Sequence, residues 1–333
     1  MDPLSQGALG AALPQAASCA RYVATAGLLG FFAGMAPDLD VLIRSSTDPL
    51  LFLEYHRQFT HALIFIPVGG LLCALVLHQL LGRRRGLLFR QSFLFCTLGY
   101  ATHALLDACT TYGTMLLWPF SDARIAWNTI SIIDPLFTLP LVLGVLFSGL
   151  SARPVYVRLA LLWAAVYMGL GMLQRDAAQD MGYTLAAQRG HEPLRLEAKP
   201  SFGNILVWKV VYETSESFYV DAVRARWQPR VYPGDSVRKL VIARDMPWLD
   251  TQSQQARDIS RFDWFSNGYI ALDPDHPNRV IDVRYSMVPN EVDALWSLQL
   301  DEDAASNEHA DYLVHRDADS DRAERLWAML FGP

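Results

Sequence analysis

Long apolar runs without charge alternate with short polar segments in the first half of the chain. Five stretches contain no Lys, Arg, Asp or Glu for 16 to 18 residues, namely 22–37, 62–77, 91–106, 135–152 and 159–174. A helix needs about 20 apolar residues to span a membrane, so each run is a candidate span once its polar ends are included. A large soluble helical core is the alternative, but five such runs joined by short linkers favour the membrane. The pattern predicts an α-helical transmembrane bundle of about five spans over residues 1–174.

The hydrophobic pattern changes after residue 174, where polar residues over 175–200 predict a linker. The segment NILVWKVVYETSESFYVDAVRA contains two β-branched and aromatic runs around a Thr-Ser-Glu-Ser turn, which predicts a β-hairpin. The segment FDWFSNGYIALDPDHPNRVIDVRYSMV predicts a second hairpin, with Asn267-Gly268 and 275–278 as turn residues. The segments EVDALWSLQL and RAERLWAMLFG predict short amphipathic helices. We therefore expect residues 201–333 to form a small soluble α+β domain.

Charge divides the chain at the same place. Up to residue 173 there are 10 Lys or Arg and 8 Asp or Glu, a net charge of +2, and the remaining 18 and 26 give −8. With a cytoplasmic N-terminus, 7 arginines lie inside and 3 outside, and Arg83–Arg85 and Arg90 supply most of the difference. The first run has no basic n-region before it and no clear cleavage signal, so we expect a retained span. An odd number of spans in a bacterial inner membrane then places the acidic C-terminal domain outside the cytoplasm.

Several function classes lack their sequence signals. None of the four cysteines is in CxxC spacing, so neither a disulfide framework nor a zinc knuckle is indicated. No Gly-rich phosphate loop or strong internal repeat occurs, and nothing indicates nucleic-acid binding.

Polar residues of metal-ligand type stand at the outer ends of the expected spans. They are Asp38, Asp40, His56, His61, His103, Asp107 and Asp134. His103 and Asp107 are four residues apart, so on a helix they share one face and can hold a common metal. An aspartate inside a bilayer costs roughly 2.5 to 3.5 kcal/mol, so Asp107 and Asp134 need a partner, which a divalent cation supplies. The convergence of these residues predicts a metal site at one end of the bundle.

Each of these residues also has a purely structural explanation, which the sequence leaves open. Asp134 can cap the helix that follows it, and Asp38 can belong to a turn. His103 and Asp107 can form a hydrogen-bonded pair that ties helices together, and His61 can be an ordinary residue of the membrane interface.

The ordered motifs PDLD, HRQFTHAL, GYATHALLDACTTYGT and LWPFSDARIAWNTISIIDPL resemble the membrane-bound metal-dependent hydrolases of the YdjM/YbcI type. The similarity covers roughly residues 30–140, and RFDWFSNG and VIDVRYSM are similar to the C-terminal extension of a subset of that family. The resemblance implies metal-site roles for the seven residues at these positions. The chain departs from the family pattern at Gln58 and Ala62, where Gly and Ser are frequent.

Three histidines and four aspartates form a mixed nitrogen and oxygen ligand set. Such a set suits zinc, manganese or ferrous iron, and seven residues are enough for two ions. Arg57 between the histidine positions is a candidate to neutralise an anionic substrate oxygen, or alternatively to pair with a lipid phosphate. Glu54 is a candidate general base, or alternatively a solvated loop residue.

We expect an inner-membrane hydrolase that uses metal-activated water to cleave an ester or phosphoester of a lipid or amphipathic substrate. The alternative is a non-catalytic membrane protein with a structural metal, whose outer domain binds another envelope protein. A transporter is disfavoured because the polar residues gather at one end of the spans.

Overall fold

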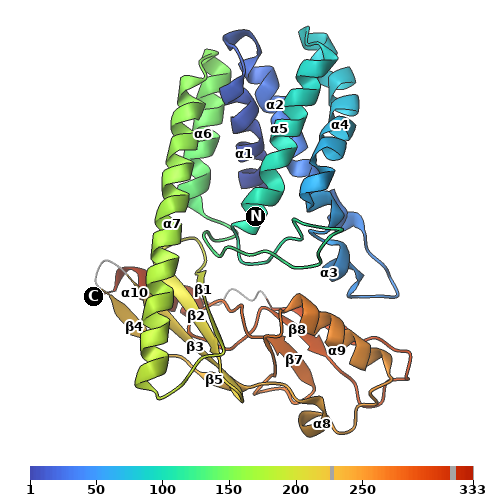
Figure 1. Ribbon diagram of the computed structural model, residues 1–333, viewed down its shortest axis with the longest axis vertical. Coiled ribbons are helices and arrows are strands. Elements are labelled where there is room, and N and C mark those ends of the chain that lie inside the picture. Colours follow the sequence, from blue (N-terminus) through green and yellow to red (C-terminus); the bar gives the residue numbers. More distant parts are fainter. Residues whose placement is uncertain (226–228, 316–319, 333) are drawn as a thin grey trace. The chain divides into compact units, whose positions relative to one another are not determined.

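The computed structural model describes residues 1–225, 229–315 and 320–332 (Figure 1). The chain forms two compact units. The first consists of Met1–Leu42, Tyr55–Met172 and Phe202–Asn204, and the second of Ile43–Glu54, Leu173–Ser201 and Ile205–Pro333.

The first unit is a bundle of helices. These are α1 (Pro3–Ala17), α2 (Val23–Met35), α4 (Ile66–Leu77), α5 (Phe89–Ala108), α6 (Pro135–Ser151) and the first part of α7 (Val155–Gln188). Over the described residues, three helical segments are long and apolar enough to cross a membrane: Ala20–Leu42, Leu63–Arg85 and Val155–Gln188. Helix α6 is a shorter apolar helix. The structure thus supports three to four spanning helices, and the expected count of about five is not confirmed.

Helix α1 was not expected from the sequence. It contains Ser5, Gln6 and Gln15 among alanines and glycines, and these three side chains are buried in the bundle. The amine of Met1 contacts the carboxylate of Asp107 near the end of α5. The N-terminus and the predicted metal site therefore lie at the same end of the bundle. A cytoplasmic N-terminus and a site at the outer ends of the spans therefore do not hold together. The side of the membrane that each end faces stays a prediction.

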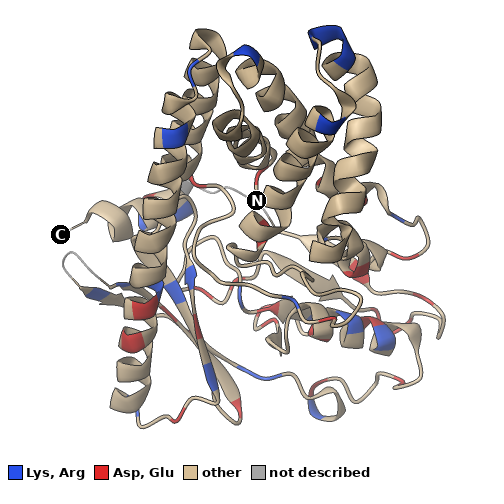
Figure 2. Ribbon diagram, turned by 45° about the horizontal axis from the view of Figure 1, so that its top comes forward, with Lys and Arg blue, Asp and Glu red and all other residues tan. Residues whose placement is uncertain are grey.

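The arginines of the first unit gather at the opposite end of the bundle. Figure 2 shows few charged residues along these helices and several Lys or Arg residues at the end away from Met1. The turn Arg83–Arg85 lies between α4 and α5, and Arg153 and Arg158 flank the start of α7. The arginine clusters therefore mark one end of the bundle and the candidate site the other.

Glycines allow α1, α2 and α5 to approach each other closely. A Cβ atom on Gly99 of α5 would lie 2.4 Å from the carbonyl oxygen of Gly30 in α2. A Cβ atom on Gly10 of α1 would lie 2.7 Å from the same oxygen. No side chain fits at these crossings, so the backbones pack directly, as small residues permit between membrane helices.

The second unit contains two antiparallel sheets and short helices. The first sheet has the order β1-β2-β3-β4, with β5 also paired to β3, and the second has the order β6-β7-β8-β9. The strands are β1 (Arg195–Pro200), β2 (Val207–Glu213), β3 (Ser217–Arg224), β4 (Arg230–Tyr232), β5 (Ser236–Arg238), β6 (Ile270–Leu272), β7 (Arg279–Asp282), β8 (Trp296–Gln299) and β9 (Asp311–Val314). The helices are α3 (Leu51–Tyr55), α8 (Ile242–Asp245), α9 (Gln254–Phe265) and α10 (Ser320–Phe331).

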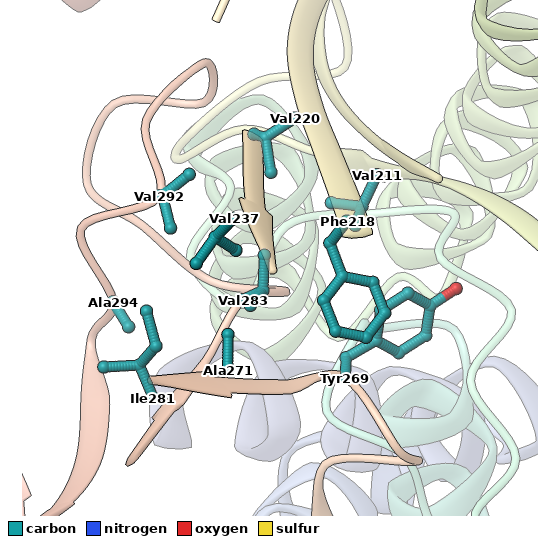
Figure 3. Close-up of a cluster of buried hydrophobic side chains, with 10 residues drawn as sticks. All are labelled: Val211, Phe218, Val220, Val237, Tyr269, Ala271, Ile281, Val283, Val292 and Ala294. Carbon is teal, nitrogen blue, oxygen red and sulfur yellow. The ribbon is translucent and has the colours of Figure 1, made fainter. Parts of the chain in front are cut away.

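One hydrophobic core joins the two sheets. Figure 3 shows Phe218 of β3 beside Tyr269, which precedes β6, and their ring centroids are 5.3 Å apart. Val211, Val220, Ala271 and Ile281 belong to the same buried cluster. The second unit is therefore an α+β domain with a core of its own.

Both predicted hairpins are present, β2 with β3 and β6 with β7. Helix α10 confirms the helix expected near the C-terminus. The expectation of a helix in EVDALWSLQL is wrong, because β8 pairs with strands on both sides and this pairing overrides the local pattern. The residues FDWF end α9 instead of starting a hairpin, and Asn267 and Gly268 adopt positive φ just after that helix.

The expected linker over residues 175–200 is largely regular structure. Helix α7 continues without interruption to Gln188, and β1 begins at Arg195. The part of α7 after residue 174 is polar because it lies beyond the apolar part of the bundle. A change from apolar to polar side chains does not by itself end a helix.

Candidate metal centre

The candidate metal centre is built from three segments of the first unit. Asp38 and Asp40 lie in the 3₁₀ segment Ala36–Leu42 that follows α2. His56 and His61 lie in the segment that leads into α4, and His103 and Asp107 lie on the last turns of α5. The structure brings these six of the seven predicted metal ligands together in two overlapping groups. The groups are Asp38, His61, His103 and Asp107, and Asp38, Asp40 and His56, and each group offers ligand atoms within 4.8 Å of one another.

The four histidine–carboxylate distances in the group of four match those of a tetrahedral metal site. Nε2 of His61 lies 3.5 Å from Oδ1 of Asp38 and 3.3 Å from Oδ2 of Asp107. Nε2 of His103 lies 3.2 Å from the same oxygen of Asp38 and 3.6 Å from that of Asp107. Tetrahedral ligands at 2.0 to 2.2 Å from a zinc ion are separated by about 3.3 to 3.6 Å. The four distances therefore fit one ion at the centre of the group.

The hydrogen bonds of the two histidines direct their Nε2 atoms at this centre. Nδ1 of His103 donates to the carbonyl oxygen of Gly34 at 2.6 Å, so this nitrogen carries the proton. Nδ1 of His61 lies 2.9 Å from Oγ1 of Thr60 and 3.2 Å from Oδ2 of Asp40. A metal-binding histidine usually makes such a contact with its second nitrogen, which fixes the ring orientation.

Two atoms at the centre are buried without a hydrogen-bond partner. Among the described residues, Nε2 of His61 and Oδ2 of Asp107 have no such partner, although both side chains have no exposed surface. Leaving a buried polar atom unsatisfied costs about 1 to 3 kcal/mol, and more for a charged group. A cation between these atoms removes that penalty, so the donor set fits a divalent metal.

Asp40 holds the segment of the histidines in place. Its Oδ1 lies 2.8 Å from Nδ1 of His56. Its Oδ2 accepts hydrogen bonds from the backbone N–H of Arg57 at 3.0 Å and from Oγ1 of Thr60 at 2.8 Å. Asp40 therefore orients His56 and His61 from the side away from the group of four.

Arg57 is fixed against the site by several contacts. Its φ of +64° is sparsely populated by residues other than glycine. Its Nε lies 3.0 Å from Oδ2 of Asp107, an ion pair without hydrogen-bond alignment, and Nη1 donates to Oγ1 of Thr110 at 3.3 Å. The ring of Tyr112 lies 4.7 Å from the guanidinium carbon. Arg57 as a whole is 5% exposed, so it belongs to the interior of the site.

Two contacts to Asp107 come from α1 and from the residue at the start of the chain, Met1. Nε2 of Gln6 donates to Oδ1 of Asp107 at 2.8 Å, and the amine of Met1 contacts the same oxygen. No sequence signal indicated these partners, because a single glutamine in an Ala- and Gly-rich segment has no metal-site spacing.

The candidate centre is reached from one side. The side chain of Asp38 is 27% exposed and that of His56 is 18% exposed, whereas His61, His103, Asp40 and Asp107 have no exposed side-chain surface. Access for water or a substrate therefore lies at Asp38 and His56.

Asp134 is not brought into this cluster, which corrects its assignment as a metal ligand. It caps α6, where its Oδ1 accepts hydrogen bonds from the backbone N–H of Leu136 at 3.1 Å and Phe137 at 3.3 Å. The hydroxyl of Tyr167 donates to both of its oxygens, at 3.0 and 2.9 Å. Over the described part of the chain, Asp134 belongs to neither group of candidate ligands. These donors satisfy its carboxylate, so no cation is needed there.

Glu54 lies in the second unit and pairs with Arg261 of α9, whose Nε donates to Oε1 at 2.6 Å. The Glu54 side chain is 38% exposed and has this partner within the second unit, so it is a partly solvated loop carboxylate.

The chain was compared with known proteins. Residues 1–178 match the family described as YdjM inner membrane protein. The chain is 37% identical over 110 residues to the inner membrane protein YbcI of Escherichia coli strain K12, a match that covers 31% of this chain and 60% of that protein. It is 20% identical over 201 residues to the uncharacterized protein YfhP of Bacillus subtilis strain 168, covering 60% of this chain and 59% of that protein. The chain thus spans about 60% of the length of both relatives. No solved structure matches.

Proposed function

This chain belongs to the YdjM inner membrane protein family, and we propose that it is a metal-dependent hydrolase of the inner membrane. The observation that carries the proposal is the group of four ligand atoms, with tetrahedral spacing and two buried atoms that have no hydrogen-bond partner among the described residues. Its two imidazoles and two carboxylates suit Zn²⁺ or Mn²⁺.

We assign the ligand roles from the contacts. His61, His103, Asp38 and Asp107 would hold the ion, and Asp40 would orient His61 through its second ring nitrogen. The second group, which adds His56, is the place for a second ion, but the hydrogen bonds that Asp40 already accepts favour one ion. Arg57 would hold Asp107 in place, since its Nε lies 3.0 Å from that carboxylate.

Hydrolysis is the chemistry that this arrangement supports best. A divalent cation held here would act as a Lewis acid and make a water molecule acidic enough to lose a proton near pH 7. Catalytic sites keep a position for water. Because four protein ligands would fill a tetrahedral ion, this position would be a fifth one, on the side where Asp38 and His56 are partly exposed. His56, with Nδ1 held by Asp40, is placed to accept or deliver a proton at its other nitrogen. A site at the end of apolar helices favours an ester or phosphoester of a lipid or amphipathic molecule.

We further propose an even number of membrane crossings, with the arginine-rich end in the cytoplasm and the candidate centre at the outer side. The number is even because Met1 and the domain after α7 then lie on the same side of the membrane. Helix α7 starts at the arginine-rich end, and Gly171 on it packs against Thr129 in the loop after α5. This direction of α7 supports an extracytoplasmic location for the domain that follows it.

The proposal is tested by metal analysis of the full chain purified in detergent without chelator. We expect stoichiometric zinc or manganese in the wild type and its loss in His103→Ala and Asp107→Ala. Phosphoester and carboxylester lipids are then screened with the ion restored. Lipid turnover by the wild type that is retained in a metal-free His103→Ala variant would refute a metal-dependent hydrolase.

A structural metal is the second candidate function. Its support is that three of the four ligands are fully buried and tie three separate segments together. In that case, metal removal lowers the unfolding temperature while no substrate is turned over, and the α+β domain is the part that binds a partner in the envelope.

A further inference from the structure

Residues 43–54 connect two ligand-bearing segments of the candidate metal centre, yet they fold as part of the second unit. Asp40 lies three residues before this connection begins, and His56 follows it after a single residue. A displacement of the connection is therefore passed to these side chains through very short lengths of chain.

The connection carries hydrophobic side chains that are buried. Leu50 is 0% exposed and Leu53 is 2% exposed. The ring of Phe52 packs edge-on against Tyr312 of β9, with ring centroids 5.1 Å apart. The contact of Phe52 with Tyr312 agrees with the assignment of the connection to the second unit.

A single arginine binds both carboxylates of the connection. Nη1 and Nη2 of Arg261, on α9, each donate to the carboxylate of Asp48 at 2.9 Å. Nε of the same guanidinium donates to Glu54 at 2.6 Å. A bidentate pair of arginine and carboxylate fixes relative orientation as well as distance. Arg261 therefore restrains the connection at two points, six residues apart, and the second of these is next but one to His56.

The guanidinium of Arg261 also binds a buried aspartate on its own helix. Asp258, one turn earlier on α9 and 0% exposed, accepts a hydrogen bond from Nη1 of Arg261 at 3.1 Å. Asp258 also accepts from the backbone N–H of Ala310 at 3.0 Å and lies 2.9 Å from Nδ1 of His309. Arg261 is thus tied to a buried residue of the second unit as well as to the connection that it binds.

We propose that Arg261 is a positioning residue for the candidate metal centre, which it serves by clamping residues 43–54 and so fixing the segment that carries His56 and His61. Arg261 would act on the site only through the conformation of this connection, whose two ends lead to Asp40 and His56. The expected effect on metal affinity rests on the proposed function, whereas the expected effect on the mobility of residues 55–61 does not.

The test uses the full chain in detergent, with Arg261→Ala and a matched control, Arg257→Ala. Arg257 lies one turn earlier on α9 and contacts only Gln254 and the carbonyl of Gln252 in the hydrogen bonds described for it. Hydrogen exchange is followed over residues 43–61 and over α5, and zinc affinity is measured by competition with a chelator. Arg261→Ala should speed exchange through residue 61 and weaken zinc binding by about tenfold, the lower range for outer partners of metal ligands. Arg257→Ala should change neither.

A second variant removes the same contacts in another way, in case Arg261→Ala does not fold. The double variant Asp48→Asn, Glu54→Gln removes the charges of the connection while it leaves Arg261 on its anchor, and it should give the same two effects. Arg261→Lys keeps the charge but loses the bidentate contact, so it should restore only part of the zinc affinity.

Faster exchange confined to residues 43–54, with residues 55–61 and zinc affinity unchanged, would overturn the positioning role. If the wild type binds no zinc, the metal proposal fails. Exchange over residues 55–61 then still decides whether the clamp reaches the site.

Discussion

The substitution Asp40→Asn tests whether Asp40 binds the metal directly or orients the residues that bind it. Asp40 is 3% exposed and receives hydrogen bonds at both oxygens. An asparagine in its place keeps one acceptor oxygen and offers an NH₂ group in place of the other. The NH₂ group fits best toward His56, where a neutral ring can accept a hydrogen bond. The remaining oxygen then still accepts from the N–H of Arg57 and from Thr60.

The expected size of the effect follows from the contacts that change. A hydrogen bond to a charged group contributes about 1.5 to 3 kcal/mol and a neutral one about 0.5 to 1.5 kcal/mol, so each retained contact weakens by roughly 1 kcal/mol. The contact with His61 loses its charge as well, which leaves Thr60 as the main partner that orients this ring. Loss of such an outer partner lowers metal affinity 10- to 100-fold, equivalent to about 1.4 to 2.8 kcal/mol.

The assay is a chelator competition with zinc on the purified full chain, and thermal unfolding is measured in parallel. Asp122→Asn is the control, because Asp122 is an exposed aspartate in the loop after α5. We expect Asp40→Asn to bind zinc 10- to 100-fold more weakly, His61→Ala to bind none, and the control to match the wild type. Unchanged affinity in Asp40→Asn would show that its contacts do not orient the ligands, and complete loss would make Asp40 a direct ligand.

Two further variants test other parts of the structure. Asp134→Ala removes the cap of α6 and the partner of Tyr167, so it should lower the free energy of unfolding by about 0.5 to 2 kcal/mol. Metal content should not change, and loss of the metal would restore Asp134 to the ligand set. Burial lowers the pKa of Lys209, on β2 in the second unit, to about 7, whereas the ordinary value is about 10.4. Between these values the unfolded chain binds the additional proton, so stability rises as pH increases from about 7 to about 10. Lys209→Met should flatten that rise in unfolding temperatures measured across this pH range, and an unchanged slope would contradict the assignment.

The residues of the candidate site could be recognised from the sequence because polar side chains next to membrane-spanning helices are energetically unfavourable without a partner. Carboxylates and imidazoles at the ends of apolar runs need a partner, and this signal found Asp38, His61, His103 and Asp107. The same signal also included Asp134, since a capping aspartate and a metal-binding aspartate look alike before the helix geometry is known. Spacing alone therefore identified the cluster but could not separate ligands from a cap.

Other features depended on contacts that no local pattern encodes. Helix α1 is buried through alanines and glycines, so it lacks the long apolar run of a membrane span. Strand β8 carries a short pattern compatible with a helix, and only its two neighbouring strands decide its conformation. The pairing of Glu54 with Arg261 joins residues that are 207 positions apart. Each of these was fixed by tertiary packing, which local propensity predicts poorly.

The glycine crossings link the packing of the bundle to the geometry of the candidate centre. Gly99 of α5 packs on Gly30 of α2, one turn before Gly34 and one turn before His103 on their respective helices. At this close approach Nδ1 of His103 reaches the carbonyl oxygen of Gly34 at 2.6 Å. That bond settles which nitrogen carries the proton and leaves Nε2 facing Asp38 and His61. A larger residue at Gly99 would separate the two backbones and break the bond. The small residues of the apolar helices therefore set the ligand orientation as much as the aspartates and histidines do.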